Sequence, residues 1–171
     1  TFNISIKNTP YSSFTFTNST GLTSIVFLGE FVDVNLSGNK SLKYIDLTTL
    51  ENLTTLNVQN CGLLELDVTK NTKLTNLACS NNALTQLNVS KNTALVKLYC
   101  SDNKLPRINV TANTALQEFD IANNLLSAMI DNHVFFGNIL CTAHSFLVAP
   151  HRFLRIQLDP AVLNHRHGND R

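Results

Sequence analysis

Between Phe31 and Leu126 the chain repeats one pattern of apolar and polar residues. An apolar residue at a start position is followed by apolar residues three and five positions later. From Leu42 onward the starts are alternately eleven and ten residues apart, so two steps make a unit of 21 residues. A period this short predicts a solenoid in which each coil packs mainly on its neighbours. The starts are Phe31, Leu42, Leu53, Leu63, Leu74, Leu84, Leu95, Leu105, Leu116 and Leu126.

Each unit has two halves, and both halves predict a short strand. The first halves begin at Phe31, Leu53, Leu74, Leu95 and Leu116, and the second halves begin between them. Alternation of apolar and polar residues at the third to fifth positions is typical of a strand with one buried face. We therefore expect two extended segments per coil, such as 77–79 and 87–89, which stack into parallel strands on two faces of a flattened core.

Asparagine recurs eight residues after most starts, at the corner where each segment ends. A buried amide can donate to one coil and accept from the next, so we expect these residues to satisfy backbone groups at the corners rather than to bind a ligand. Cys61 and Leu50 interrupt the two series, and we expect fewer satisfied groups there. The series are Asn82, Asn103 and Asn124 in the first halves and Asn71, Asn92 and Asn113 in the second halves.

The four cysteines, Cys61, Cys79, Cys100 and Cys141, lack the spacing of a metal site. Cys79 and Cys100 are one unit apart and five residues after a start, so they should lie on adjacent coils. That separation permits a disulfide. However, both side chains should point into the core, and we favour two small buried thiols.

The two ends depart from the repeat. At the N-terminus Phe14, Phe16 and Phe27 take leucine positions, which predicts an atypical first coil or a short hairpin covering the stack, or alternatively the end of a preceding β-sandwich. After Met129, apolar residues between Phe136 and Leu147 fall at helical spacing and predict an amphipathic helix over the last coil. We place the boundaries at 1–30 for the N-terminal repeats or cap, 31–130 for the array, and 131–171 for a C-terminal cap or irregular tail.

Composition narrows the function. The chain has 171 residues, a formal charge of +1 and no run of Lys and Arg, which argues against nucleic acid as a partner. No stretch of about 18 apolar residues predicts a membrane span. All five histidines follow residue 132, so the repeats hold no Ser-His-Asp or Cys-His set, and we expect neither an enzyme nor a cofactor. For His151, His165 and His167 a solvated tail is favoured over a metal site.

The repeated segments resemble the leucine-rich-repeat family, in which LxxLxLxxNxL forms the inner strand of each coil. The remaining parts of each unit resemble a nested 21-residue subclass found mainly in secreted and surface proteins of bacteria, where cysteine is common in the inner strand. The resemblance implies a leucine-rich-repeat solenoid that is exported and binds a protein or glycan through one strand face. The segments are LTTLNVQNCGL (53–63), LTNLACSNNAL (74–84), LVKLYCSDNKL (95–105) and LQEFDIANNLL (116–126).

The outward positions of the first halves carry the candidate site. Tyr99 is the aromatic residue of this grid, and charges of both signs surround it, a composition typical of protein interfaces. A merely solvated face, as in a structural spacer between other domains, is the alternative. The second halves carry three carboxylates, Asp46, Glu65 and Asp67. We interpret them as solvated side chains rather than as a weak cation site. The residues that we predict to bind are Asn57, Asn76, Lys97, Tyr99, Glu118 and Asp120.

Overall fold

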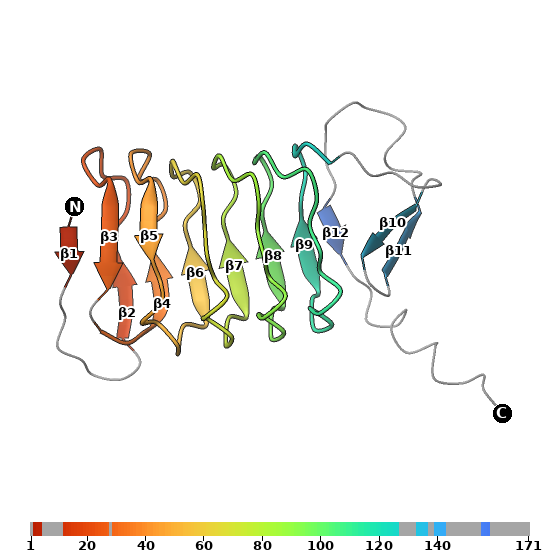
Figure 1. Cartoon of the computed structure of the whole chain (residues 1–171), viewed down its shortest axis with the longest axis horizontal. Coiled ribbons are helices and arrows are strands. Elements are labelled where there is room, and N and C mark those ends of the chain that lie inside the picture. Colours follow the sequence, from red (N-terminus) through yellow and green to blue (C-terminus); the bar gives the residue numbers. More distant parts are fainter. Residues whose placement is uncertain are drawn as a thin grey trace.

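The protein is a parallel β-solenoid whose coils stack along one axis (Figure 1). The computed structural model describes residues 12–27 and 29–126, together with the backbone of four further strands at 2–4, 133–136, 139–142 and 155–157. No helix occurs in these ranges. The stacked coils that the repeat predicts are therefore confirmed.

One face of the stack is a seven-stranded sheet built from the first halves. Its strands are parallel except for the last, β12, which pairs antiparallel with β9. Leu56, Leu77 and Leu98 lie opposite one another across β6, β7 and β8, so the 21-residue period fixes the register. The strands are, in spatial order, β12 (Arg155–Gln157), β9 (Glu118–Asp120), β8 (Lys97–Tyr99), β7 (Asn76–Ala78), β6 (Thr55–Asn57), β4 (Phe31–Asn35) and β2 (Ser12–Thr15).

The opposite face carries strands only near the N-terminus. There β1 (Phe2–Ile4), β3 (Ser24–Phe27) and β5 (Tyr44–Asp46) form a three-stranded parallel sheet. Between residues 63 and 115 the second halves form no strand, including the segment 87–89 where one was expected. The alternation still places Leu87 and Val89 in the core. It determines which side chains are buried, but not whether neighbouring backbones hydrogen-bond.

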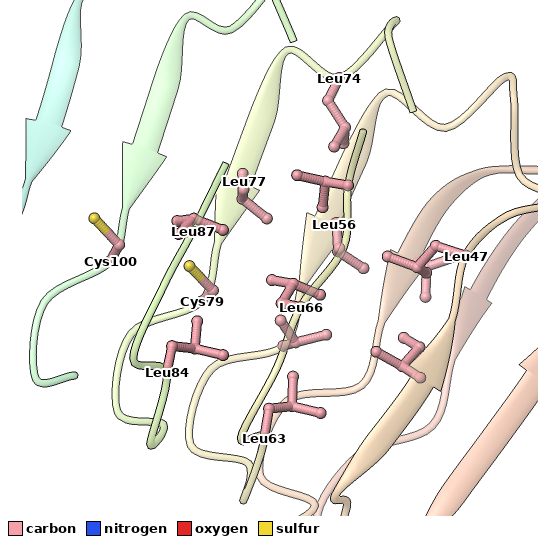
Figure 2. Close-up of a cluster of buried hydrophobic side chains, with 14 of the residues drawn as sticks. Leu47, Leu56, Leu63, Leu66, Leu74, Leu77, Cys79, Leu84, Leu87 and Cys100 are labelled. Atoms are coloured by element: carbon pink, nitrogen blue, oxygen red, sulfur yellow. The ribbon is translucent and has the colours of Figure 1, made fainter. Parts of the chain in front are cut away.

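Leucines from both halves fill a continuous core along the stack (Figure 2). Leu77 and Leu98 of the first halves are fully buried, whereas Leu66 and Leu87 of the second halves keep 7% and 8% of their surface exposed. Burying each side chain contributes roughly 1.5–3 kcal/mol. The core leucines on the side with regular strands are therefore better shielded from solvent.

The N-terminal residues continue the coils. β2 pairs parallel with β4, and β3 pairs parallel with β5, so this part is not an antiparallel hairpin. The rings of Phe14, Phe27 and Phe31 pack edge to face with centroids 5.5–5.7 Å apart, which explains why phenylalanine replaces leucine here. The domain boundaries themselves stay predictions.

The prediction of a helix between Phe136 and Leu147 is wrong for the first part of that segment. β10 (His133–Phe136) and β11 (Ile139–Thr142) pair as antiparallel strands. A short apolar run rich in Phe and Ile suits either a helix or a strand, and periodicity alone does not separate them. The remaining part of the predicted helix, and His151, His165 and His167, lie outside the described residues.

A left-handed residue occupies the seventh position after each first-half start, a regularity that the hydrophobic pattern did not predict. Gly38 and Asn60, for example, have φ of 78° and 53°. The chain turns sharply here, and the backbone N–H of Asn60 donates to Ser80 O of the next coil at 3.0 Å. Gly, Asn and Asp tolerate this conformation best, so their recurrence was a readable signal. The other members are Asn81, Asp102 and Asn123.

Candidate binding site on the seven-stranded sheet

The register of β6 to β9 gathers the six predicted residues on one face. Side chains at equivalent positions of successive strands form rows that cross the sheet, because every strand is shifted by one unit. The first row is Thr55, Asn76, Lys97 and Glu118, and the second row is Asn57, Ala78, Tyr99 and Asp120. The structure thus brings the predicted residues side by side, although they span more than 60 residues of sequence.

An ionic network links the two rows at the C-terminal end. Lys97 Nζ lies 2.9 Å from Glu118 Oε1, and the Tyr99 hydroxyl donates to Glu118 Oε2. The lysine and glutamate side chains are 43% and 28% exposed, so the pair adds little stability. The hydrogen bond to Glu118 does, however, fix the position of the Tyr99 side chain, which leans toward the coil of β9.

Beside this network lies an open hollow of about 440 Å³. Ala78, the small residue between Asn57 and Tyr99 in the second row, forms its floor. Its lining combines amides, one aromatic ring and one carboxylate, whereas Asn76, Lys97 and Glu118 lie outside it. The six predicted residues therefore separate into a hollow and a neighbouring ion pair. The lining residues are Asn57, Gln59, Ala78, Tyr99 and Asp120.

Local hydrogen bonds hold the polar walls of the hollow. Asn57 Oδ1 accepts the backbone N–H of Gln59 at 3.1 Å, and Asp120 Oδ1 accepts that of Ala122 at 3.1 Å. These turns fix the side chains where the strands end. In the part of the chain that the structure describes, Asp120 forms no salt bridge. β12 flanks this wall, because Arg155 lies opposite Asp120 in the antiparallel pair of β12 and β9.

Two serines that follow β7 and β8 are buried, although alternation predicts that their side chains point outward. Ser80 and Ser101 are only 3% and 7% exposed, and Ser101 Oγ donates to Ser80 Oγ at 3.0 Å. Alternation assigns a side chain to one side of a strand, but each strand here has three residues and ends before these serines. The exposed face is therefore two rows wide at β7 and β8, whereas Gln59, after β6, is half-buried and lines the hollow.

The first-half amides satisfy the corners as expected. Asn103 Nδ2 donates to Cys79 O at 3.0 Å and Cys100 O at 3.2 Å, and its Oδ1 accepts Leu84 N at 3.0 Å. Asn82 and Asn124 make the same set one coil away on each side. Asn39, which was not predicted as a member of the series, bonds in the same way to Phe16 O, Leu36 O and Ser19 N.

The second-half amides donate to backbone carbonyls as expected, but they do not accept, so only the accepting role is wrong for this series. Asn92 Nδ2 donates to Val68 O at 2.9 Å and Asn71 O at 2.8 Å. Its Oδ1 is buried without a hydrogen-bond partner, as are those of Asn71 and Asn113. The N–H of Leu74 is the counterpart, in the preceding coil, of the donor that Asn103 uses, and it donates instead to the backbone oxygen of Asn71 at 3.1 Å. The tight backbone turn therefore uses the N–H donor that Asn92 Oδ1 would need.

The three cysteines whose side chains the structure describes, Cys61, Cys79 and Cys100, are core residues. Cys79 and Cys100 are free, fully buried and stacked on neighbouring coils (Figure 2). Burial raises the pKa of Cys79 to about 12 and raises that of Cys100 well above its ordinary value, which leaves neither as a thiolate nucleophile. Cys61 Sγ lies 3.2 Å from Leu36 O, a weaker substitute for the asparagine bonds of the other coils.

The opposite face offers a second groove of about 720 Å³ across three second halves. Glu65, Asp67 and Arg107 contribute its charges, over a floor that includes Leu66 and Leu87. Within the described ranges, no three His, Cys, Asp or Glu residues gather as a metal site would require. No described helix is long and apolar enough to span a membrane.

A solved structure supports the repeat architecture. The chain is similar to a structure described as the functional domain of InlJ from Listeria monocytogenes, which includes a cysteine ladder. The identity is 37% and the TM-score 0.54, over 65% of this chain and 23% of that one. The stacked Cys79 and Cys100 correspond in kind to that feature. No family model and no curated protein matches the chain. This is thus a repeat protein that spans about a quarter of its structural neighbour.

Proposed function

We propose that the chain is a non-catalytic binding module of an exported bacterial protein, and that it recognises a protein or glycan through the outer face of β6 to β9. The hollow of Asn57, Ala78, Tyr99 and Asp120 is the observation that carries the proposal. Aromatic and polar groups converge there on rigid strands, as they do at interaction hot spots. The leucine-rich-repeat resemblance implies the same role and the exported location, and the similarity to the InlJ domain supports the repeat architecture.

The chemistry of the repeats agrees with a binding role. The thiols of Cys79 and Cys100 are buried, and the repeats contain no histidine to act as a base. The alternative is a structural spacer that holds other domains apart. A spacer would require the stacked coils, but it would give the side chains of Tyr99 and Asp120 no role.

Changing the two faces separately tests the proposal. Tyr99→Thr with Asp120→Asn keeps good strand formers and the turn bond to Ala122, but removes the ring and the negative charge. Gln86→Thr with Asp67→Asn is the matched control on the opposite groove. Each purified protein would be used as bait with host or envelope extracts, and captured molecules compared by mass spectrometry.

We expect a captured partner to be lost with the first pair and kept with the second, while both proteins melt within about 2 °C of the parent. Loss of the captured partner with the control pair alone would place the binding site in the opposite groove. Equal capture by all three proteins, or by none, would support the spacer instead.

A further inference from the structure

We propose that the groove across the second halves binds an extended segment of a protein partner that carries a basic and an acidic residue three positions apart. The groove lies on the face opposite Tyr99 and Asp120, so it is a second surface, beyond the binding face proposed above. Glu65 and Arg107 are the two side chains that select this partner.

Two rows of outward side chains form the walls of the groove, and core side chains between them form its floor. In each second half the residues two and four positions after the start are exposed, whereas the residue three positions after it packs on the core. The groove therefore follows the stack axis over three coils, and an elongated chain fits it better than a compact ligand. The walls are Glu65, Gln86 and Arg107 on one side and Asp67, Asn88 and Asn109 on the other.

The two ends of the groove carry opposite charge. Glu65 lies in its first coil and Arg107 in its third, and both side chains are exposed. Among the described residues neither forms a salt bridge or a side-chain hydrogen bond. The charge of Asp67 is already partly compensated, because hydrogen bonds from Thr69 and the nearby charge of Lys70 stabilise the carboxylate and lower its pKa. A partner with one cation and one anion would therefore pair with both uncompensated groups.

The distance between the two charges sets their spacing in the partner. Hydrogen bonds hold successive second halves together at both ends. At the start, Lys104 N donates to Leu84 O at 2.9 Å. At the end, Asn113 Nδ2 donates to Asn92 O at 2.8 Å. Two coil spacings therefore amount to roughly 10 Å, and an extended peptide advances roughly 3.3 Å per residue, so three residues cover this distance.

The middle of the groove suits a peptide main chain. Asn88 Oδ1 accepts the N–H of Ser90 at 3.1 Å, which leaves the amide nitrogen as a donor to a peptide carbonyl. On the other wall, the exposed amide of Gln86 can donate and accept. The lining has no aromatic ring on which a sugar could stack, and a neutral sugar would leave Glu65 and Arg107 without counter-charges. A peptide is therefore favoured over a glycan.

Titration of the ¹⁵N-labelled chain with the blocked peptide Lys-Ser-Thr-Glu tests the proposal. The control peptide, blocked Lys-Glu-Ser-Thr, has the same composition but adjacent charges. We expect the first peptide to shift the backbone amides of Gln86, Asn88 and Arg107, and to bind roughly fivefold more tightly than the control. Added salt should reduce this difference.

Variants of the chain test the two charges separately. Glu65→Gln and Arg107→Gln each remove one charge, and each should weaken binding of Lys-Ser-Thr-Glu about fivefold. Glu51→Gln and Lys104→Gln are matched controls that should leave binding unchanged, because they remove exposed charges of the same signs outside the groove. Thermal unfolding would verify that all four variants keep the fold.

Equal binding of the two peptides, shifts confined to other residues, or no shifts at all would overturn the peptide site. Equal losses with the control variants would also overturn it, because they would indicate general attraction between charges. Stronger shifts of the same amides by cellotetraose would overturn it in favour of a glycan. The binding face proposed above is tested separately, because the variants used for it leave Glu65 and Arg107 unchanged.

Discussion

The two halves of each coil begin from the same apolar pattern but reach different structures. First halves form a sheet whose strands hydrogen-bond through the whole stack, and their corner amides both donate and accept. Second halves beyond Leu63 lie against the same core without strands, and their amides leave an oxygen unpaired. The comparison shows that a repeated core pattern establishes stacking, while backbone pairing decides which side becomes a rigid face.

Core truncations should give the largest contrast. Leu77→Ala in β7 removes a side chain with 0% exposure, and we expect a loss of about 4 kcal/mol in unfolding free energy. Leu87→Ala in the second half of the same coil should cost about 2–3 kcal/mol, since that position is 8% exposed and its backbone lies in no sheet. Urea unfolding followed by circular dichroism would measure both, and a larger loss for Leu87→Ala would contradict the comparison.

Corner amides should give the next largest effects. Asn103→Ala leaves the N–H of Leu84 without a partner and removes one of the two amide donors to each of Cys79 O and Cys100 O, at a cost of about 3 kcal/mol. Asn92→Ala leaves no N–H unpaired, because Val68 O and Asn71 O keep their backbone donors, and it also removes an unpaired buried oxygen, so about 2 kcal/mol is expected. Thr93→Ala, at an exposed neighbouring position, serves as the control. Equal losses for the two asparagines would show that the unpaired oxygen carries no penalty.

Acid should give the smallest effect. Hydrogen bonds from the side chain and backbone of Thr69 lower the pKa of Asp67, in the second half. A lowered folded pKa means that the carboxylate adds stability above the unfolded value, and that this contribution is lost as pH falls through the folded value, below about pH 4.

Asp67→Asn keeps an oxygen for the turn but cannot titrate. Because the residue is exposed, we expect only a few tenths of a kcal/mol to disappear between pH 6 and pH 3 in the parent relative to this variant. Urea midpoints at the two pH values would measure the difference. A parent that gained stability relative to Asp67→Asn on acidification would show that the folded pKa of Asp67 is raised rather than lowered.

Much of the fold was readable from sequence because its signals were local and repeated. The spacing of Leu74, Leu77 and Cys79 predicted an inward-facing segment, and its recurrence after 21 residues predicted the register with Leu98 and Cys100. The predicted binding residues came from the same alternation, and the structure places them on one face. The antiparallel pairing of β10 with β11 was missed because no repeat supported a choice between helix and strand there.

The sequence by itself determined that coils stack, which leucines turn inward and where the corners fall, because those properties depend on a period that every unit shares. Tertiary structure decided the rest. It buried Ser80 and Ser101, left Asn92 Oδ1 without a donor, and opened a hollow over Ala78 between side chains from four strands. These outcomes depend on the contacts between neighbouring coils, and no single unit of the sequence encodes those contacts.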